Sequence, residues 1–382
     1  MEYRILGRTG LKVGAIALGC EGFADKTAEE VRADFDFAIR NGINFLDLYA
    51  SNPELRSNIG AALAGRREKF VIQGHLCSVW EEGQYLRTRD PEKSLAAFED
   101  LLARLGTDYV EIGMIHYVDA EADLREVLDG PIMRLAQRLR SEGRIGHIGL
   151  SSHNPVVAHM AARTGLIDVL MFSVNPCYDL LPPSDDVDTL WADESYAREL
   201  HNIDPERQRL YEFCEREGIA IDVMKAYGGG DLLSDANSPF GRPITPVQCL
   251  EYALTRPGVA AGMAGCRSRA EIEAALGWCS ATAAERDYTG VLAGLDKFSW
   301  EGHCMYCGHC APCSVGIDIA GVNKYYNLTL AQHEIPETVR EHYRLLPHHA
   351  SECIACGRCE RNCPFGVDII GHMRLAAAKF GY

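Results

Sequence analysis

Eight cysteines form two closely spaced groups near the end of the sequence. They are Cys304, Cys307, Cys310 and Cys313, followed by Cys353, Cys356, Cys359 and Cys363. The second group, CIACGRCERNCP, has the C-x₂-C-x₂-C-x₃-C-P spacing that binds [4Fe–4S] clusters. In this pattern three neighbouring thiolates bind one cluster, and the fourth cysteine reaches the cluster beside it. The spacing therefore predicts iron–sulfur chemistry.

The first group departs from this pattern, because its last gap is two residues and Pro312 precedes the last cysteine instead of following it. We still predict two [4Fe–4S] clusters, each bound by cysteines from both groups. The predicted ligand sets are Cys304, Cys307, Cys310 and Cys363 for one cluster and Cys353, Cys356, Cys359 and Cys313 for the other. The alternative is a pair of structural zinc sites. Zinc usually takes two C-x₂-C pairs with a longer spacer, which fits two tight quartets poorly.

The other seven cysteines are scattered singly, which does not fit a short secreted scaffold with paired cysteines. They are Cys20, Cys77, Cys177, Cys214, Cys249, Cys266 and Cys279, and we expect them to be reduced, buried and inert. The net charge of −16 argues against nucleic acid and against an anionic membrane surface as partners. The sequence has no apolar run near the roughly 20 residues of a membrane helix and no signal-peptide core. These features predict a cytoplasmic protein.

Apolar runs that dominate both faces predict eight buried strands. The runs are 15–19, 44–49, 70–76, 109–118, 145–152, 168–175, 219–227 and 259–265. Helical patterns lie between them, as in 27–42, where Thr27 and Glu30 form a capping box. Eight strands that are each followed by a helix predict a (β/α)₈ barrel. A doubly wound sheet is the alternative, but no GxGxxG motif follows the first strand.

The composition becomes cysteine-rich at about residue 296, which predicts a barrel over 1–295 and a small domain over 296–382. No Gly/Ser linker separates the two, so we expect the small domain to dock on the barrel. Within it, 336–346 reads as a helix that covers one cluster. In the barrel, the long acidic loop 176–207 is a candidate lid, and a solvated insertion is the alternative.

The barrel resembles the aldo-keto reductase family over residues 2–280. The resemblance rests on YRILGRTGLKVGAIALGC, GINFLDLY, YVEIGMIHYV, IGHIGLSSHN and MAGCRSRAEIEAAL. Some members of that family carry a C-terminal ferredoxin-like extension, and this chain looks like one of them. The resemblance implies an oxidoreductase built as a (β/α)₈ TIM barrel, followed by a small α-rich ferredoxin-like domain with two [4Fe–4S] clusters.

The family's chemistry uses an aspartate, a tyrosine, a lysine and a histidine. Asp47 matches the aspartate and His116 matches the histidine. The tyrosine position holds Asn52, and the lysine position at the end of the third strand holds His75. An asparagine amide does not titrate near neutrality, so it cannot donate a proton in the tyrosine's manner. We therefore expect a catalytic set that departs from the family's own.

Substitutes for the missing groups lie at the C-terminal ends of the strands, where barrel enzymes place their active sites. The predicted catalytic residues are Asp47, Tyr49, His75, His116 and Lys225, with His153 as a further candidate. Each of them has the alternative reading of a packed or hydrogen-bonded core residue. The side chains of Trp80, Tyr85 and Tyr117 near the same opening suit a substrate ring.

The resemblance also implies a nucleotide site for NAD(P)H in the loop after the eighth strand. Arg267 and Ser268 match its basic and hydroxyl positions, and Ser151 is assigned to the same cofactor. A helix N-terminus at this point favours phosphate. The alternative is a solvated basic turn.

The sequence thus predicts an oxidoreductase that moves electrons between its clusters, with or without NAD(P)H, and a small organic substrate at the barrel mouth. A carbonyl or enone is the expected substrate class, and a ferredoxin or another electron donor is a candidate partner. One alternative is a redox-neutral lyase or isomerase with structural or sensory clusters. Another is an electron carrier or sensor that keeps the barrel as a scaffold.

Overall fold

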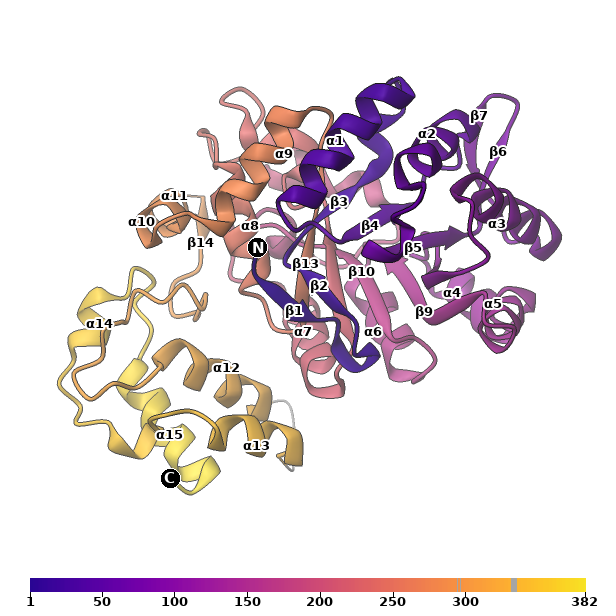
Figure 1. Cartoon of the computed structure of the whole chain (residues 1–382). Coiled ribbons are helices and arrows are strands. Elements are labelled where there is room, and N and C mark those ends of the chain that lie inside the picture. Colours follow the sequence, from indigo (N-terminus) through magenta and orange to yellow (C-terminus); the bar gives the residue numbers. More distant parts are fainter. Residues whose placement is uncertain (294, 296, 331–334) are drawn as a thin grey trace.

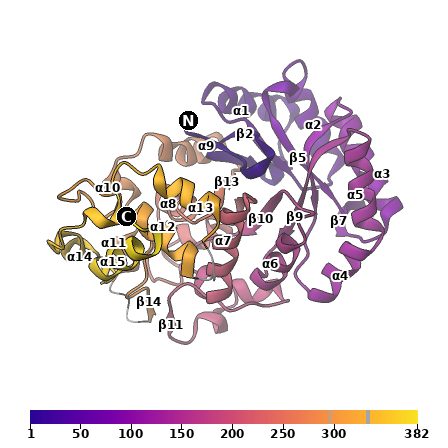
Figure 2. The ribbon, with the colours of Figure 1, turned by 90° about the horizontal axis from the view of Figure 1, so that it is seen from below.

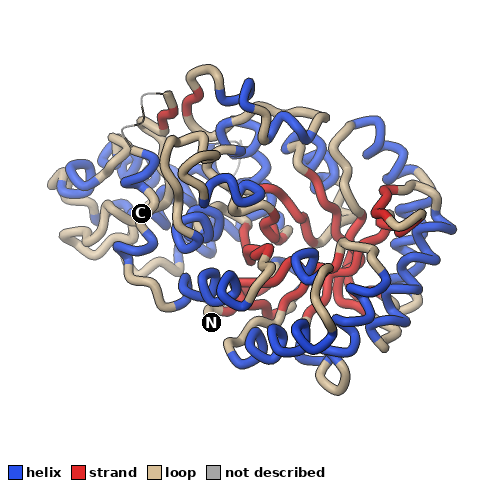
Figure 3. The backbone as a smooth tube through the Cα atoms, turned by 90° about the horizontal axis from the view of Figure 1, so that it is seen from above, coloured by secondary structure: helices blue, strands red, loops and turns tan. Residues whose placement is uncertain are grey.

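Eight parallel strands close into a barrel in the computed structural model, which describes residues 1–293, 295, 297–330 and 335–382. Around the barrel the strands are β3 (Ile16–Gly19), β4 (Phe45–Leu48), β5 (Val71–Leu76), β8 (Val110–Ile115), β9 (Ile145–Ser152), β10 (Val169–Ser173), β12 (Ala220–Met224) and β13 (Val259–Gly265). Each lies within one of the eight predicted runs. The predicted (β/α)₈ barrel is confirmed, and Figure 3 shows its strands grouped at the centre with helices around them.

Helices follow the strands and cover the outside of the barrel (Figure 1). They are α1 (Ala28–Arg40), α2 (Pro53–Leu63), α3 (Pro91–Leu105), α4 (Glu121–Asp129), α5 (Pro131–Ser141), α6 (Pro155–Arg163), α7 (Pro205–Glu217), α8 (Pro246–Leu254) and α9 (Arg269–Leu276). Side-chain caps fix where several of them begin. The Thr27–Glu30 capping box is present, and Asp90 and Asn154 accept backbone N–H groups at the starts of α3 and α6.

Two hairpins interrupt this pattern, and neither was predicted from the sequence. The first, β1 (Tyr3–Ile5) with β2 (Lys12–Gly14), leads into the barrel, and Val13 shares a buried cluster with Phe45 and Ile112 inside it. The second, β6 (Ser78–Glu81) with β7 (Gln84–Arg87), follows β5 at the mouth. Apolar side chains therefore fill one end of the barrel, and polar groups gather at the other.

The acidic loop 176–207 lies at the barrel mouth. Its Trp191 ring stacks on the Lys225 ammonium, 4.3 Å from the ring centroid. Its β11 (Leu200–His201) pairs with β14 (Phe298–Ser299), which ties the loop to the start of the C-terminal domain. At its base, buried Asp179 accepts hydrogen bonds from the Tyr211 and Tyr252 hydroxyls. The loop is thus anchored at both ends over the predicted site.

The C-terminal domain is helical and lies against the α7–α8 side of the barrel (Figures 1 and 2). Its helices are α12 (Ile319–Leu330), α13 (Glu337–Arg344), α14 (Arg358–Asn362) and α15 (Ile369–Phe380). α12 packs against α7, and Lys324 forms a 2.7 Å ion pair with Glu215. The expected docking and the helix expected within 336–346 are both present. The predicted domain boundary falls between Leu295 and Asp296, and Asp296 lies outside the described residues.

In the described part of the chain, no helix combines the length and the apolar character that a bilayer span requires.

The Asp179 anchor generates a stability prediction. Asp179→Ala leaves the guanidinium of Arg207, 3.5 Å away and 1% exposed, buried without its partner. We expect the free energy of unfolding to fall by about 3–5 kcal/mol. Anaerobic urea unfolding followed by far-ultraviolet circular dichroism measures this change. Glu121→Ala, which removes an exposed pair with Arg125, is the control and should cost below about 0.5 kcal/mol. Equal losses in the two variants would contradict the assigned role.

Candidate active site

A buried carboxylate at the end of β4 organises the barrel mouth. Asp47 Oδ1 accepts a hydrogen bond from His75 Nε2 at 2.8 Å and another from Gln73 Nε2 at 2.9 Å. The Gln73 amide also donates to Asp222 Oδ2 at 3.1 Å. Burial, and then the charge of Asp47, raise the pKa of Asp222 well above its ordinary value. This favours a protonated Asp222 beside the Asp47 carboxylate.

The hydrogen bonds continue from Asp47 to the surface. The Nδ1 atoms of His75 and His116 lie 2.8 Å apart, and His116 Nε2 lies 2.6 Å from the Tyr85 hydroxyl. Tyr85 belongs to the β6–β7 hairpin and is 37% exposed. The Tyr49 ring stacks on His116, with an angle of 3° between the ring planes and 5.4 Å between centroids. An unbroken chain of polar atoms therefore links buried Asp47 to a tyrosine that reaches solvent.

The hydrogen-bonding capacity of the groups assigns the proton positions in this chain. Since the Asp47 carboxylate only accepts, His75 donates from Nε2, and its Nδ1 accepts when the ring is neutral. His116 must then donate from Nδ1, so its Nε2 accepts the Tyr85 proton. If His75 carries a second proton, every bond beyond it reverses, and the Tyr85 O–H becomes free to donate outward. The chain thus has two ordered states that differ by one proton.

Burial holds the members of this chain in defined protonation states. It lowers the pKa of His116 well below its ordinary value, and the neighbouring His75 adds to the shift. Burial also raises the pKa of Tyr85 to about 12 and raises that of Tyr49, which a contact with Glu21 raises further. His116 is therefore neutral at neutral pH, and both tyrosines keep their protons.

The opposite side of the mouth carries a cation and a second histidine–carboxylate pair. His153 Nδ1 lies 2.8 Å from buried Asp119 Oδ2, and the Tyr117 ring packs edge-on against His153. Burial lowers the pKa of half-buried Lys225, and within the described residues no carboxylate lies at ion-pair distance from it. Lys225 and Tyr117 both have positive φ, at 58° and 53°, a strained backbone conformation that clusters at functional sites. Lys225 therefore faces the mouth unpaired and is not bonded to Asp47.

The two positions that depart from the family tetrad have different roles here. Asn52, in the tyrosine position, caps α2, because its Oδ1 accepts from the Glu54 and Leu55 N–H groups. His75, in the lysine position, makes the bond to Asp47. The structure thus brings four predicted residues together, namely Asp47, Tyr49, His75 and His116. It adds Gln73, Asp222 and the hydroxyl of Tyr85 to this group. The Tyr85 hydroxyl reaches His116 because of the β6–β7 hairpin, which the sequence pattern did not predict.

The residues predicted to bind a nucleotide are engaged in local bonds. The Ser268 hydroxyl caps α9 by accepting from Glu271 N, and the Glu271 carboxylate accepts from Arg267 N at 2.7 Å. A carboxylate thus occupies the anion position of this helix N-terminus. The Arg267 side chain is exposed and has no hydrogen-bond or ion-pair partner in the described chain. The buried Ser151 hydroxyl accepts from Tyr117 N. Only the Arg267 guanidinium favours a phosphate here.

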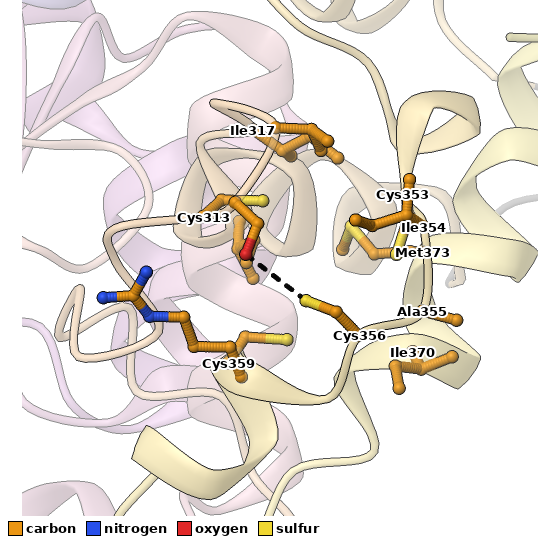
Figure 4. A pocket seen from close by; sticks show the side chains of 13 residues that line it. Cys313, Ile317, Cys353, Ile354, Ala355, Cys356, Cys359, Ile370 and Met373 are labelled. Carbon is orange, nitrogen blue, oxygen red and sulfur yellow. Dashed lines mark hydrogen bonds between the residues drawn. The ribbon is translucent and has the colours of Figure 1, made fainter.

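One pocket in the C-terminal domain gathers cysteines from both sequence groups. Its lining includes Cys313, Cys353, Cys356 and Cys359, together with apolar side chains such as Ile317 (Figure 4). These four cysteines are one of the two predicted ligand sets, and a set of only sulfur donors around an apolar cavity suits an iron–sulfur cluster. The Ser314 hydroxyl lies 3.5 Å from Cys356 Sγ. Cys356 is exposed, so this quartet lies at the surface.

The other predicted ligand set lies on the barrel side of the domain. Burial raises the pKa of Cys304, of Cys307 and of Cys310, and charge on Cys363 adds to each shift, which places this fourth cysteine beside them. Among the described residues, no three His, Cys, Asp or Glu side chains converge as ligands of a single metal ion. The remaining seven cysteines are unpaired, and six of them are buried as expected.

Comparison with known families assigns both parts of the chain. Residues 11–245 match the model of the aldo/keto reductase family. This chain belongs to that family. Residues 303–368 match the model of the 4Fe-4S dicluster domain, which confirms the predicted iron–sulfur domain. The chain is therefore an oxidoreductase-type barrel with an iron–sulfur domain attached, as the motifs predicted.

Individual relatives match less than half of this chain. The chain is 27% identical over 179 residues to the uncharacterized oxidoreductase YqkF of Bacillus subtilis, covering 45% of this chain and 56% of that protein. It is 30% identical over 165 residues to L-glyceraldehyde 3-phosphate reductase of Escherichia coli, covering 41% and 46%. The chain thus spans about half the length of these relatives.

Solved structures confirm the fold alone. Aldo-keto reductase AKR11C1 from Bacillus halodurans, in its holo form, superposes with a TM-score of 0.58 at 22% identity, covering 75% of this chain and 94% of that one. The putative aldo-keto reductase PA4992 from Pseudomonas aeruginosa gives 0.55 at 22% identity, covering 73% and 95%.

The lowered pKa of His116 predicts how stability depends on pH. Below about pH 6.5 the unfolded chain binds a proton at this histidine and the folded chain does not, so stability falls as the pH falls. Replacing His116 with glutamine should remove up to about 1.4 kcal/mol per pH unit of this slope. Urea unfolding between pH 7.5 and pH 5.5 measures it. His201→Gln, at a side chain that is 58% exposed, should leave the slope unchanged. An unaltered slope in the His116 variant would refute the buried neutral state.

Proposed function

We propose that this family member reduces a small organic substrate at the barrel mouth, using electrons from two [4Fe–4S] clusters and a proton delivered by Tyr85. The observation that carries the proposal is the hydrogen-bond chain from Asp47 through His75 and His116 to the Tyr85 hydroxyl. The chain begins at the buried Asp47 carboxylate and ends at the Tyr85 hydroxyl, on a side chain that reaches the mouth. Such a chain is suited to moving one proton to or from a bound substrate.

The cysteines divide into a part-buried quartet beside the barrel and a second quartet whose Cys356 is exposed, which suits a path between solvent and barrel. Cys304, Cys307, Cys310 and Cys363 would hold one cluster, and Cys313, Cys353, Cys356 and Cys359 the other. When bound, these clusters supply one-electron transfer. Because Cys356 is exposed, we propose that an external donor such as a ferredoxin docks at this quartet.

Proton delivery follows from the two ordered states of the relay. When His75 is protonated, His116 donates to the Tyr85 oxygen, so the Tyr85 O–H points toward the substrate. Proton loss from Tyr85 returns the chain to its neutral order, because a proton then moves from His116 to the Tyr85 oxygen and another from His75 to His116. Reduction of one C=O or C=C bond needs two electrons and two protons. Tyr85 supplies one proton, and water at the mouth supplies the other.

The lining of the mouth suits a small acceptor with a ring or an anionic group. Tyr49, Tyr85 and Tyr117 present aromatic surface, and Lys225 presents an ammonium without a carboxylate partner. We therefore propose a carbonyl or enone compound as the substrate class. NAD(P)H remains part of the proposal as an alternative donor, supported by family membership and by the exposed Arg267. The unpaired cysteines fit a reducing compartment, so we also propose a cytoplasmic location.

A redox-neutral lyase or isomerase is the second candidate. It is favoured by one observation, which is that the histidine relay needs no electron to change its protonation state. In that case the clusters stabilise the fold or sense redox conditions. The two candidates differ in whether turnover consumes electrons.

Turnover by a Tyr85 variant tests the proposal. Anaerobic enzyme supplied with reduced methyl viologen and either 2-cyclohexen-1-one or 4-nitrobenzaldehyde should oxidise the viologen and release the reduced product. Replacing Tyr85 with phenylalanine should lower kcat by about 10²–10⁴-fold, the usual contribution of a general acid. Iron content should stay unchanged.

Tyr3→Phe is the matched control. Tyr3 belongs to the β1–β2 hairpin, away from the relay, and its hydroxyl donates to the Gly42 carbonyl. We expect its turnover to match the parent enzyme. Equal kcat in the Tyr85 variant and the parent would refute the proton role. Conversion of 2-cyclohexen-1-one to 3-cyclohexen-1-one with no viologen consumed would favour the redox-neutral candidate.

Iron counting tests the crossed ligand sets. The anaerobic parent protein should contain about eight irons per chain. Cys363→Ser removes the fourth ligand of Cys304, Cys307 and Cys310, so iron should fall toward about four and one electron paramagnetic resonance signal should disappear. Cys279→Ser, at a scattered cysteine, should keep all the iron. Zinc in place of iron in the parent would overturn the electron-transfer proposal.

A further inference from the structure

A buried arginine joins the barrel to the loop of the first cysteine quartet. Arg256 follows α8 and is 2% exposed. Its guanidinium donates from Nη2 to the carbonyl of Met305, which lies between Cys304 and Cys307 in the sequence. The Tyr288 hydroxyl donates to the same carbonyl at 2.8 Å. The barrel thus holds this loop through a permanently charged side chain.

The charge of Arg256 has no carboxylate partner. In the described ranges no ion pair includes it, and its Nη1 has no hydrogen-bond partner. Two other arginines are equally buried, at 1% exposure, and both are paired, Arg56 with Asp100 at 3.2 Å and Arg207 with Asp179 at 3.5 Å. An uncompensated buried charge is strongly destabilising, so a negative group is expected near Arg256.

The surroundings of Arg256 stabilise a cation without neutralising it. The guanidinium carbon lies 4.5 Å from the Tyr252 ring centroid and 5.4 Å from that of Tyr306. The Tyr252 hydroxyl donates to buried Asp179, which is already paired with Arg207. The guanidinium itself bonds the loop of Cys304 and Cys307, where a four-thiolate cluster would place negative charge.

We propose that Arg256 is the fixed countercharge of the first quartet, formed by Cys304, Cys307, Cys310 and Cys363, and that it favours an electron on the barrel side of the domain. This inference rests on the proposed cluster occupancy. Reduction adds one negative charge to this quartet, and a nearby guanidinium shielded from water stabilises the reduced state more than the oxidised state. One electron leaves the second quartet, formed by Cys313, Cys353, Cys356 and Cys359, and one arrives at the first quartet, with no bond made or broken.

The second quartet provides the contrast. Its nearest cations, Arg358 and Arg361, lie at the surface, with Arg361 Nη1 3.4 Å from the Cys356 carbonyl. Surface charges are screened by water and salt. Arg256 therefore acts as a positioning residue for electron transfer, and its effect is confined to one of the two clusters.

Redox titration of the holoprotein, followed by electron paramagnetic resonance, tests the proposal. Arg256→Met removes the charge and keeps the side-chain length. We expect the one-electron reduction equilibrium of the first quartet in this variant to shift at least tenfold toward the oxidised state. This corresponds to a midpoint reduction potential that is lower by about 59 mV. The second signal should not move. Arg256→Lys keeps the charge, and its equilibrium should stay within about threefold of the parent. The signal lost in Cys363→Ser identifies the first quartet.

Controls separate failure of this inference from failure of the proposed function. Arg56→Met removes a buried charge on α2, in the barrel and outside the domain that carries the two cysteine quartets. The midpoint reduction potentials of both clusters should therefore match those of the parent. If the methionine variant loses iron, Arg256→Gln keeps a donor for Met305 without the charge and decides the question. Unchanged midpoints in a neutral variant with full iron, or equal shifts in the lysine and neutral variants, would overturn the countercharge role. Absence of iron from the parent protein would overturn the proposed function instead.

Discussion

The bond between Asp47 and His75 sets the direction of each later hydrogen bond in the chain that leads to Tyr85. A carboxylate can only accept, so it fixes the tautomer of His75, then that of His116, and finally the orientation of the Tyr85 hydroxyl. Gln73 holds the same carboxylate from the barrel interior. The strand register that places Asp47 opposite Gln73 is thus the constraint behind the site. A shift of one residue would turn Asp47, His75 or both away from the barrel axis.

If Tyr85 is the proton donor, as we propose, this arrangement moves the donor relative to the family's own chemistry. The family's tyrosine follows the second strand, at the position where Asn52 now begins α2. In the proposed mechanism the donor comes instead from the β6–β7 hairpin after the third strand, and two histidines bridge the gap to Asp47. A histidine in the lysine position makes this possible, because an imidazole both accepts and donates whereas an ammonium only donates. The altered tetrad is therefore a connected replacement rather than a loss of two groups.

Much of this could be read from the sequence, and the limits have physical reasons. Strand positions follow from buried apolar runs such as 259–265, and the start of α1 follows from the Thr27–Glu30 box. Placement at strand ends was enough to group Asp47, Tyr49, His75 and His116. The hydroxyl of Tyr85 and the bond through Gln73 depend on hairpin geometry and on contacts across the barrel, which no local pattern encodes. The role of Arg256 could not be predicted from the sequence, because it rests on the fact that no carboxylate of the described residues pairs with this side chain in the folded chain.

Two cations in this acidic chain are held by aromatic rings instead of carboxylates. Lys225 lies against Trp191 at the mouth, and Arg256 lies between Tyr252 and Tyr306 at the domain junction. A ring stabilises a cation through its quadrupole but leaves the net charge in place, whereas a carboxylate would cancel it. With a net charge of −16 the chain has many carboxylates to spare, so their absence at these two sites is informative. On the proposed function, each site retains a positive charge for a negative partner that the described residues do not provide, a substrate at the mouth and a cluster at the junction.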